Sequence, residues 1–180
     1  ALGGSYSTVQ AGRPTGLNPL QTEIDARGQA WLADWLASLL ERRDQPLTPV
    51  QTNRLQEVVR QNASAGNAGL RNWSDFASLL VSTDDDGDLF ERMQEWTAEG
   101  RYGWIFGSNT EDTFSLDGDV SGFDLTGILD SESERERMAV LSYLFRRVER
   151  VIEDRKPTII VIDEAWKALD NAYFAERLSN

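Results

Sequence analysis

Two adjacent carboxylates near the end of the chain have the residue types and the setting to do chemistry. Asp163 and Glu164 directly follow the β-branched run 158–162, which is typical of a strand buried on both faces of a parallel sheet. Such a strand holds the side chains that follow it at the carboxyl edge of the sheet, where ligands bind in open α/β folds. There an aspartate can hold Mg²⁺, and a neighbouring glutamate can orient and deprotonate an attacking water.

The same arrangement of aliphatic residues and two acids is the Walker B pattern of nucleotide-hydrolysing ATPases; the alternative is a plain core strand followed by a polar turn. A P-loop, the phosphate-gripping partner motif, requires G-x-x-x-x-G-K-[ST]. The only lysines are Lys156 and Lys167, which follow Arg155 and Trp166 rather than glycine. Either the Walker B interpretation is wrong, or the P-loop lies upstream of Ala1.

A second acidic stretch, 84–88, suggests a calcium loop. With Gly87 at the sixth position of an EF-hand loop, Met93 occupies the twelfth, where a bidentate glutamate is required. The calcium pattern therefore fails, and we expect a solvated loop that leads into a helix cap.

Other pairs suggest chemistry more weakly. The acids at 111–112 and 117–119 have the form of paired glycosidase carboxylates, but a chain with 30 acidic residues produces such pairs by chance. Trp31 and Trp35 lie one helical turn apart and could form a platform for a stacked ligand. Packing in a helical core or interface is the favoured interpretation of the two tryptophans.

The composition excludes several other chemistries. The 180 residues contain no cysteine and no histidine, so disulfides, thiolate nucleophiles, His-ligated metals and Ser-His-Asp triads are excluded. The formal net charge of −12 disfavours generic binding to nucleic-acid phosphates. No run approaches the roughly 20 apolar residues of a membrane-spanning helix. The first residue, Ala1, and the helical-looking stretch that stops at Asn180 indicate a piece of a longer protein.

Helical periodicity dominates 22–99. Apolar residues spaced three and four apart predict an amphipathic helix over 23–43. A short helix capped by Ser74 is predicted near 74–81, and another is predicted from Asp88. The helix between them and 23–43 has an N-cap, a proline in its first turn and a capping-box partner, at Thr48, Pro49 and Gln51.

Extended segments flank this helical region. Short strands or extended stretches are predicted at 5–9, 102–106 and 120–125. A capping box of Ser131 and Glu134 opens a long helix that Pro157 stops. Because the interior strand 158–162 follows, the predicted fold class is α/β with an all-helical insertion.

Four stretches together resemble the large energising ATPase of type IV secretion and bacterial conjugation systems, the VirB-four class. The most specific are Gly-Leu-Asn-Pro-Leu at 16–20 and Asp-Glu-Ala-Trp-Lys at 163–167. Their order matches that family's ATPase domain, and the resemblance spans nearly the whole chain. The full set of matching stretches is 2–6, 12–20, 122–126 with 128–130, and 159–169.

The resemblance implies a partial RecA-like P-loop NTPase core, with parallel strands flanked by helices, in 1–21 plus 100–180. It implies an all-helical insertion at 22–99. Two residues receive functional roles from it: Asp163 coordinates Mg²⁺ through water, and Glu164 is the catalytic residue that activates water. It places the P-loop upstream of this chain, and the sensor and arginine-finger residues beyond it.

For the parent protein, the resemblance implies ATP and Mg²⁺ as cofactors, with no firm expectation of either for this piece on its own. It implies a hexameric homo-oligomer that works with other secretion-system subunits, in the cytoplasm and peripheral to the bacterial inner membrane. Direct nucleic-acid binding and a transmembrane segment are not expected.

Two functions from different classes stay open. The chain is either part of a motor ATPase that powers secretion, conjugative transfer or pilus assembly, or a non-catalytic helical module that docks secretion-system subunits. A related hexameric DNA-pumping ATPase is a third possibility, which the acidic charge and the wording of 163–167 disfavour. A G-x-x-x-x-G-K-[ST] motif upstream of Ala1 in the parent reading frame would separate an ATPase from a scaffold.

Overall fold

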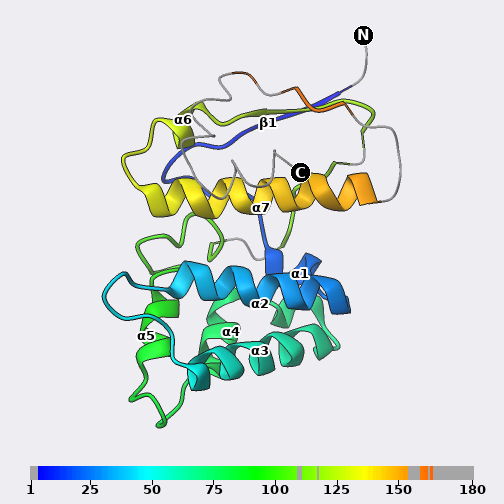
Figure 1. Ribbon diagram of the computed structural model, residues 1–180. Helices are drawn as coiled ribbons and strands as arrows, with labels where there is room; N and C mark the ends of the chain where they lie inside the picture. The colour runs from blue at the N-terminus through cyan, green and yellow to red at the C-terminus, as the bar shows by residue number, and fades with distance from the viewer. Residues whose placement is uncertain (1–3, 109–110, 117, 154–158, 162, 164–180) are drawn as a thin grey trace. The chain divides into compact units, whose positions relative to one another are not determined.

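The computed structural model divides the chain into two compact units (Figure 1). The sheet unit comprises Ala1–Ala11 and Ser115–Asn180, and the helical unit comprises Gly12–Phe114. Among the described residues the fold is mixed α/β, with seven α-helices and one two-stranded parallel sheet. No helix in this described region is long and apolar enough to cross a bilayer. The structure describes residues 4–108, 111–116, 118–153, 159–161 and 163.

The sheet unit is built on two neighbouring parallel strands, β1 (Ser5–Thr8) and β2 (Ser121–Asp124), with Ser5 opposite Ser121. Both strands were predicted from the sequence, and both are confirmed. Parallel neighbours need a crossover connection of a dozen or more residues. Here that crossover contains the entire helical unit, because the chain leaves β1, runs through Gly12–Phe114 and returns as β2.

Two helices complete the described residues of the sheet unit: α6 (Thr126–Leu129) and α7 (Glu134–Glu153), which contact each other. The long helix is confirmed, but its cap differs from the prediction. The Ser133 Oγ accepts a hydrogen bond from the Glu136 N–H at 3.3 Å, so Ser133 rather than Ser131 occupies the N-cap. The apolar stripe of α7 buries Ala139, Val140, Tyr143 and Leu144.

The interior strand predicted at 158–162 is not found among the described residues. Ile159, Ile160 and Val161 adopt no regular structure and are 91%, 48% and 87% exposed, while residues 158 and 162 lie outside the described ranges. A strand buried in a parallel sheet needs paired neighbours and covered faces. The described sheet consists of β1 and β2 alone, and neither pairs with this segment. The prediction is therefore wrong for these three residues.

The helical unit contains five α-helices around one apolar core. All of 22–99 is described, and no strand is found there. The core takes fully buried leucines from the second and third helices, Leu32, Leu36, Leu40 and Leu55. In chain order the helices are α1 (Pro19–Thr22), α2 (Ala26–Leu40), α3 (Pro49–Ser64), α4 (Trp73–Leu79) and α5 (Asp88–Gln94), with a 3₁₀ turn at Ala68–Leu70.

Local capping explains where these helices begin. The capping box predicted at α3 is confirmed: the Thr48 Oγ1 accepts from the Gln51 N–H, and the Gln51 side chain accepts from the Thr48 N–H. Helix α4 starts one residue earlier than predicted, because the Asn72 side chain, not that of Ser74, accepts from the Asp75 N–H at 2.9 Å.

The segment after α5 is wound into turns, so the extended stretch predicted at 102–106 is wrong. Three glycines let the chain approach the backbone of residues 94–98 closely. A Cβ atom on Gly103 would lie 2.2 Å from the Thr97 carbonyl oxygen, and one on Gly107 would lie 2.4 Å from the Trp96 carbonyl oxygen. This close winding buries Ile105 and Phe106.

Candidate functional site

Only one member of the carboxylate pair singled out from the sequence is described. Asp163 lies in a turn and is exposed, whereas Glu164 lies outside the described residues. The structure therefore does not bring the two carboxylates together or apart, and their roles stay predictions.

The carboxyl edge of the two-stranded sheet carries another acid, Asp124. The Val9 N–H donates to the Asp124 carbonyl oxygen at 3.0 Å, which extends the β1–β2 ladder to this edge. The Asp124 carboxylate accepts from the Thr126 N–H at 3.0 Å, and hydrogen bonds from the backbone and side chain of Thr126 hold the pKa of this carboxyl below its usual value. Asp124 thus anchors the first residue of α6 at the edge where parallel sheets bind ligands.

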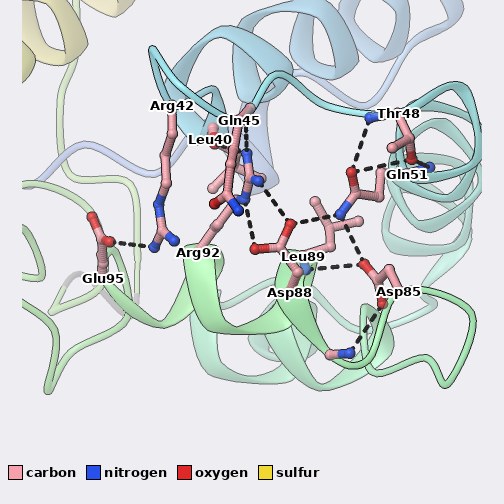
Figure 2. A network of polar contacts seen from close by, with 11 residues as sticks. Leu40, Arg42, Gln45, Thr48, Gln51, Asp85, Asp88, Leu89, Arg92 and Glu95 are labelled. Atoms are coloured by element: carbon pink, nitrogen blue, oxygen red, sulfur yellow. Dashed lines mark hydrogen bonds and ion pairs between the residues drawn. The ribbon is translucent and has the colours of Figure 1, made fainter.

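A buried arginine organises the polar network of the helical unit (Figure 2). Arg92 on α5 is 2% exposed, and its Nε and Nη2 lie 3.0 and 2.8 Å from the two carboxylate oxygens of Asp88. Its Nη1 donates to the carbonyl oxygens of Leu40 and Gln45, at 3.2 and 2.7 Å. This guanidinium therefore ties α5 to the loop between α2 and α3, and the i, i+4 spacing of Asp88 and Arg92 is the sequence pattern that could have indicated it.

The amide of Gln51 joins the acidic loop to the same network. Its Nε2 donates to the Asp85 carboxylate at 3.1 Å and to the Asp88 carboxylate at 2.8 Å. Asp85 also accepts from the N–H groups of Gly87 and Leu89. Because these carboxylates bind donors of their own protein, the network starts α5 rather than forming a cation loop, and no metal-binding group of three such side chains is found in the described residues.

The network makes the stability of the helical unit depend on pH. The hydrogen bond from Arg92, opposed by burial and assisted by Gln51, holds the pKa of Asp88 below its usual value. A lowered carboxyl pKa stabilises the fold above the unfolded-state pKa of about 3.9, and this stabilisation is lost as pH falls through the folded-state pKa. We expect Asp88→Asn to lower the urea midpoint at about pH 7, and the gap from wild type to narrow at about pH 3.

Tryptophan fluorescence would report this unfolding, because five of the six tryptophans belong to Gly12–Phe114. The matched control is Asp84→Asn, at an exposed position of the same acidic loop. An Asp88→Asn gap of the same size at both pH values would contradict the assignment.

The tryptophan pair belongs to an aromatic core. Trp31 and Trp35 are stacked, with ring centroids 5.3 Å apart and an interplanar angle of 17°. Trp35 is 5% exposed and meets Phe106 edge-on at 5.3 Å, while Phe106 stacks on Trp73 at 5.1 Å. The packing interpretation of the pair therefore agrees with the structure.

The family stretch 16–20 is also buried. Leu17, Asn18 and Leu20 are fully buried, and Asn18 begins α1 by accepting the Leu20 N–H at 3.2 Å. The backbone N–H of Asn18 donates to the Asp112 carboxylate at 2.8 Å. Asp112 thus has a structural partner that its sequence neighbourhood did not indicate, because the two residues lie on opposite sides of the helices in the chain order.

Comparisons with known proteins add a relation over most of the chain. No protein family matched in a scan of the sequence. The chain is 32% identical over 177 residues to the type IV secretion system protein virB4 of Bartonella henselae, which covers 97% of this chain and 22% of that protein. It is 32% identical over 185 residues to the type IV secretion system protein PtlC of Bordetella pertussis, with 98% and 22% covered.

A third relative comes from conjugation. The chain is 30% identical over 162 residues to a probable conjugal transfer protein, TrbE, of Sinorhizobium fredii, which covers 90% of this chain and 22% of that protein. The chain therefore spans 22% of the length of each of these relatives.

Proposed function

We propose that this chain, which is related over nearly its whole length to type IV secretion proteins of the VirB-four class, is part of a motor that energises secretion, conjugative transfer or pilus assembly by ATP hydrolysis. The observation that carries the proposal is the 30–32% identity to virB4, PtlC and TrbE over 90–98% of the chain. Since the chain spans 22% of each relative, the proposed activity belongs to a longer protein.

Within this proposal, Asp163 and Glu164 form a Walker B motif in a partial RecA-like P-loop core. The parallel pair β1–β2 is of the strand type that such a core uses. Asp163 is exposed, and a carboxylate oxygen is a ligand that Mg²⁺ prefers, so the donor fits the ion. Asp163 would hold Mg²⁺ through water, and Glu164 would orient and deprotonate the water that attacks the terminal phosphate. ATP supplies the phosphoanhydride bond that is cleaved.

The proposed setting is a hexamer at the cytoplasmic face of the bacterial inner membrane, among other secretion-system subunits. The direct test is Mg²⁺-dependent ATP hydrolysis by the purified full-length protein that contains this chain. Turnover above that of a sample without Mg²⁺ is expected. Absence of turnover in the assembled protein, with its partner subunits present, would overturn the motor proposal.

A second candidate function is a non-catalytic helical module that docks secretion-system subunits. The observation that favours it is the compactness of Gly12–Phe114, which has its own apolar and aromatic core. The same hydrolysis assay separates the candidates, because a docking module predicts no turnover in the full-length protein.

The isolated 180-residue chain is expected to bind Mg-ATP weakly or not at all. Backbone amides and the lysine of a P-loop normally supply most of the grip on phosphates, and this sequence contains no such motif. Isothermal titration of the chain with Mg-ATP should give no micromolar-affinity transition. A micromolar affinity would contradict the expectation and would point to a phosphate site among its arginines.

A further inference from the structure

The incoming and outgoing stretches of the helical unit meet each other through three hydrogen bonds. The Thr113 N–H donates to the Gly16 carbonyl oxygen at 2.9 Å, and the Asn18 N–H donates to the Asp112 carboxylate at 2.8 Å. In return, the Asp112 N–H donates to the Gln21 side-chain oxygen at 2.9 Å. Asp112 is therefore both acceptor and donor toward the same incoming stretch, which is separated from it by more than 90 residues.

These contacts are continuous with the core of the helical unit. The Asn18 Nδ2 donates to the Arg71 carbonyl oxygen at 3.2 Å, and the Asn62 Nδ2 donates to the Leu20 carbonyl oxygen at 2.8 Å. Arg71 in turn donates to the last carbonyl groups of α3, including that of Ala65 at 2.7 Å. The incoming loop is thus bonded both to the outgoing stretch and to the end of α3.

The backbone conformation at this junction requires glycine. Gly16 has φ +77°, a left-handed conformation that other residues rarely adopt, and a Cβ atom there would lie 2.3 Å from the Thr113 Oγ1. Gly12 has a similar φ of +75°, but nothing lies within 4 Å of its Cβ position. The close approach is therefore particular to Gly16, and the chain offers a matched position without it.

We propose that Gly16, Asn18, Gln21, Asp112 and Thr113 form a clasp that closes the helical unit, so that Gly12–Phe114 keeps its fold when both connections to the sheet unit are cut. The clasp lies just inside the two boundaries of the unit, and its central donor, the N–H of the fully buried Asn18, is held by a carboxylate of the outgoing stretch. The inference goes beyond the proposed motor function and does not depend on ATP hydrolysis.

The first experiment cuts the whole chain at its two connections. Protease sites inserted between Ala11 and Gly12, and between Ser115 and Leu116, are cleaved after the 180-residue protein has folded. Hydrogen exchange should then show that amides of α2 and α3 keep their protection, within about threefold of the uncut protein. Loss of that protection after double cleavage would overturn the proposal, because the unit would then depend on its connections.

The second experiment tests the clasp in the uncut chain. Asp112→Ala leaves a buried N–H without its acceptor, so the Asn18 and Thr113 amides should exchange roughly tenfold to a hundredfold faster. Asp112→Asn keeps an oxygen acceptor and should have a smaller effect. Glu111→Ala, at the exposed neighbouring position, should leave both rates unchanged. Equal rates in Asp112→Ala and Glu111→Ala would overturn the clasp.

A glycine pair keeps the test decisive if Asp112→Ala does not fold. Gly16→Ala introduces the close approach to Thr113, whereas Gly12→Ala introduces only left-handed strain. Exchange at Thr113 should rise at least about tenfold more in Gly16→Ala than in Gly12→Ala. Equal exchange in the two variants would contradict a clasp at this position.

Discussion

The Glu164→Gln form of the full-length protein is expected to hydrolyse ATP roughly a hundred- to ten-thousand-fold more slowly than the wild type, the usual cost of losing a general base. Glutamine keeps the shape of the side chain and some of its hydrogen bonding, but it does not accept the proton of the attacking water. Nucleotide affinity should persist, because Mg²⁺ is assigned to Asp163. Steady-state turnover and equilibrium binding of Mg-nucleotide, measured on the same preparation, separate the two effects.

The neighbouring substitution is the matched comparison. Asp163→Asn should weaken Mg-nucleotide binding as well as turnover, because it removes charge from the proposed Mg²⁺ ligand. If the two acids merely begin a helix, either substitution would change stability slightly and leave turnover unaltered. Undiminished turnover in Glu164→Gln would retire the Walker B assignment.

Gly103→Ala is expected to destabilise the helical unit by about 3 kcal/mol, at the upper end of the usual cost of overpacking. The added Cβ would lie 2.2 Å from the Thr97 carbonyl oxygen and 2.7 Å from that of Ala98, and both obstacles are backbone atoms. Relief therefore requires the chain itself to move. That movement would disturb Tyr102, whose ring lies 4.7 Å from that of Trp96.

Gly66→Ala is the control for this prediction. It replaces an exposed glycine whose Cβ would meet nothing within 4 Å, so its unfolding midpoint should stay close to that of the wild type. Urea unfolding followed by tryptophan fluorescence compares the two variants under the same conditions. Equal midpoints for Gly103→Ala and Gly66→Ala would show that the winding of residues 94–107 tolerates a side chain.

Local sequence patterns predicted the elements whose causes are themselves local. The apolar spacing of 23–43 corresponds to α2, and the Thr48–Gln51 capping box begins α3. Capping residues that compete within a few positions were harder to assign, as the choices of Asn72 over Ser74 and Ser133 over Ser131 show. In each case several polar side chains could accept the same orphan N–H groups, and the sequence does not rank them.

The features that were not predicted depend on contacts distant in the chain. Nothing near Asp112 indicates a bond to Asn18, because their pairing requires the whole helical unit to fold first. The aromatic letters of 102–106 favour a strand, but Gly103 and Gly107 allow a close backbone approach that turns this segment into the core. The apolar run at 158–162 was predicted to be an interior strand from composition alone, and its described residues are exposed. For the proposed site, the sequence supplied the candidate acids but not their geometry.

The clasp has a consequence for the order in which the chain folds. Roughly 110 residues separate β1 from β2, and joining strands across such a loop costs chain entropy that grows with the logarithm of loop length. Once Gly16 and Thr113 are bonded, the free chain between the strands shrinks to roughly 16 residues, which lowers the cost of closure by about 1.5–2 kcal/mol. The distant strands then behave kinetically as near neighbours, so the pairing of β1 with β2 should follow, rather than precede, the formation of the helical unit.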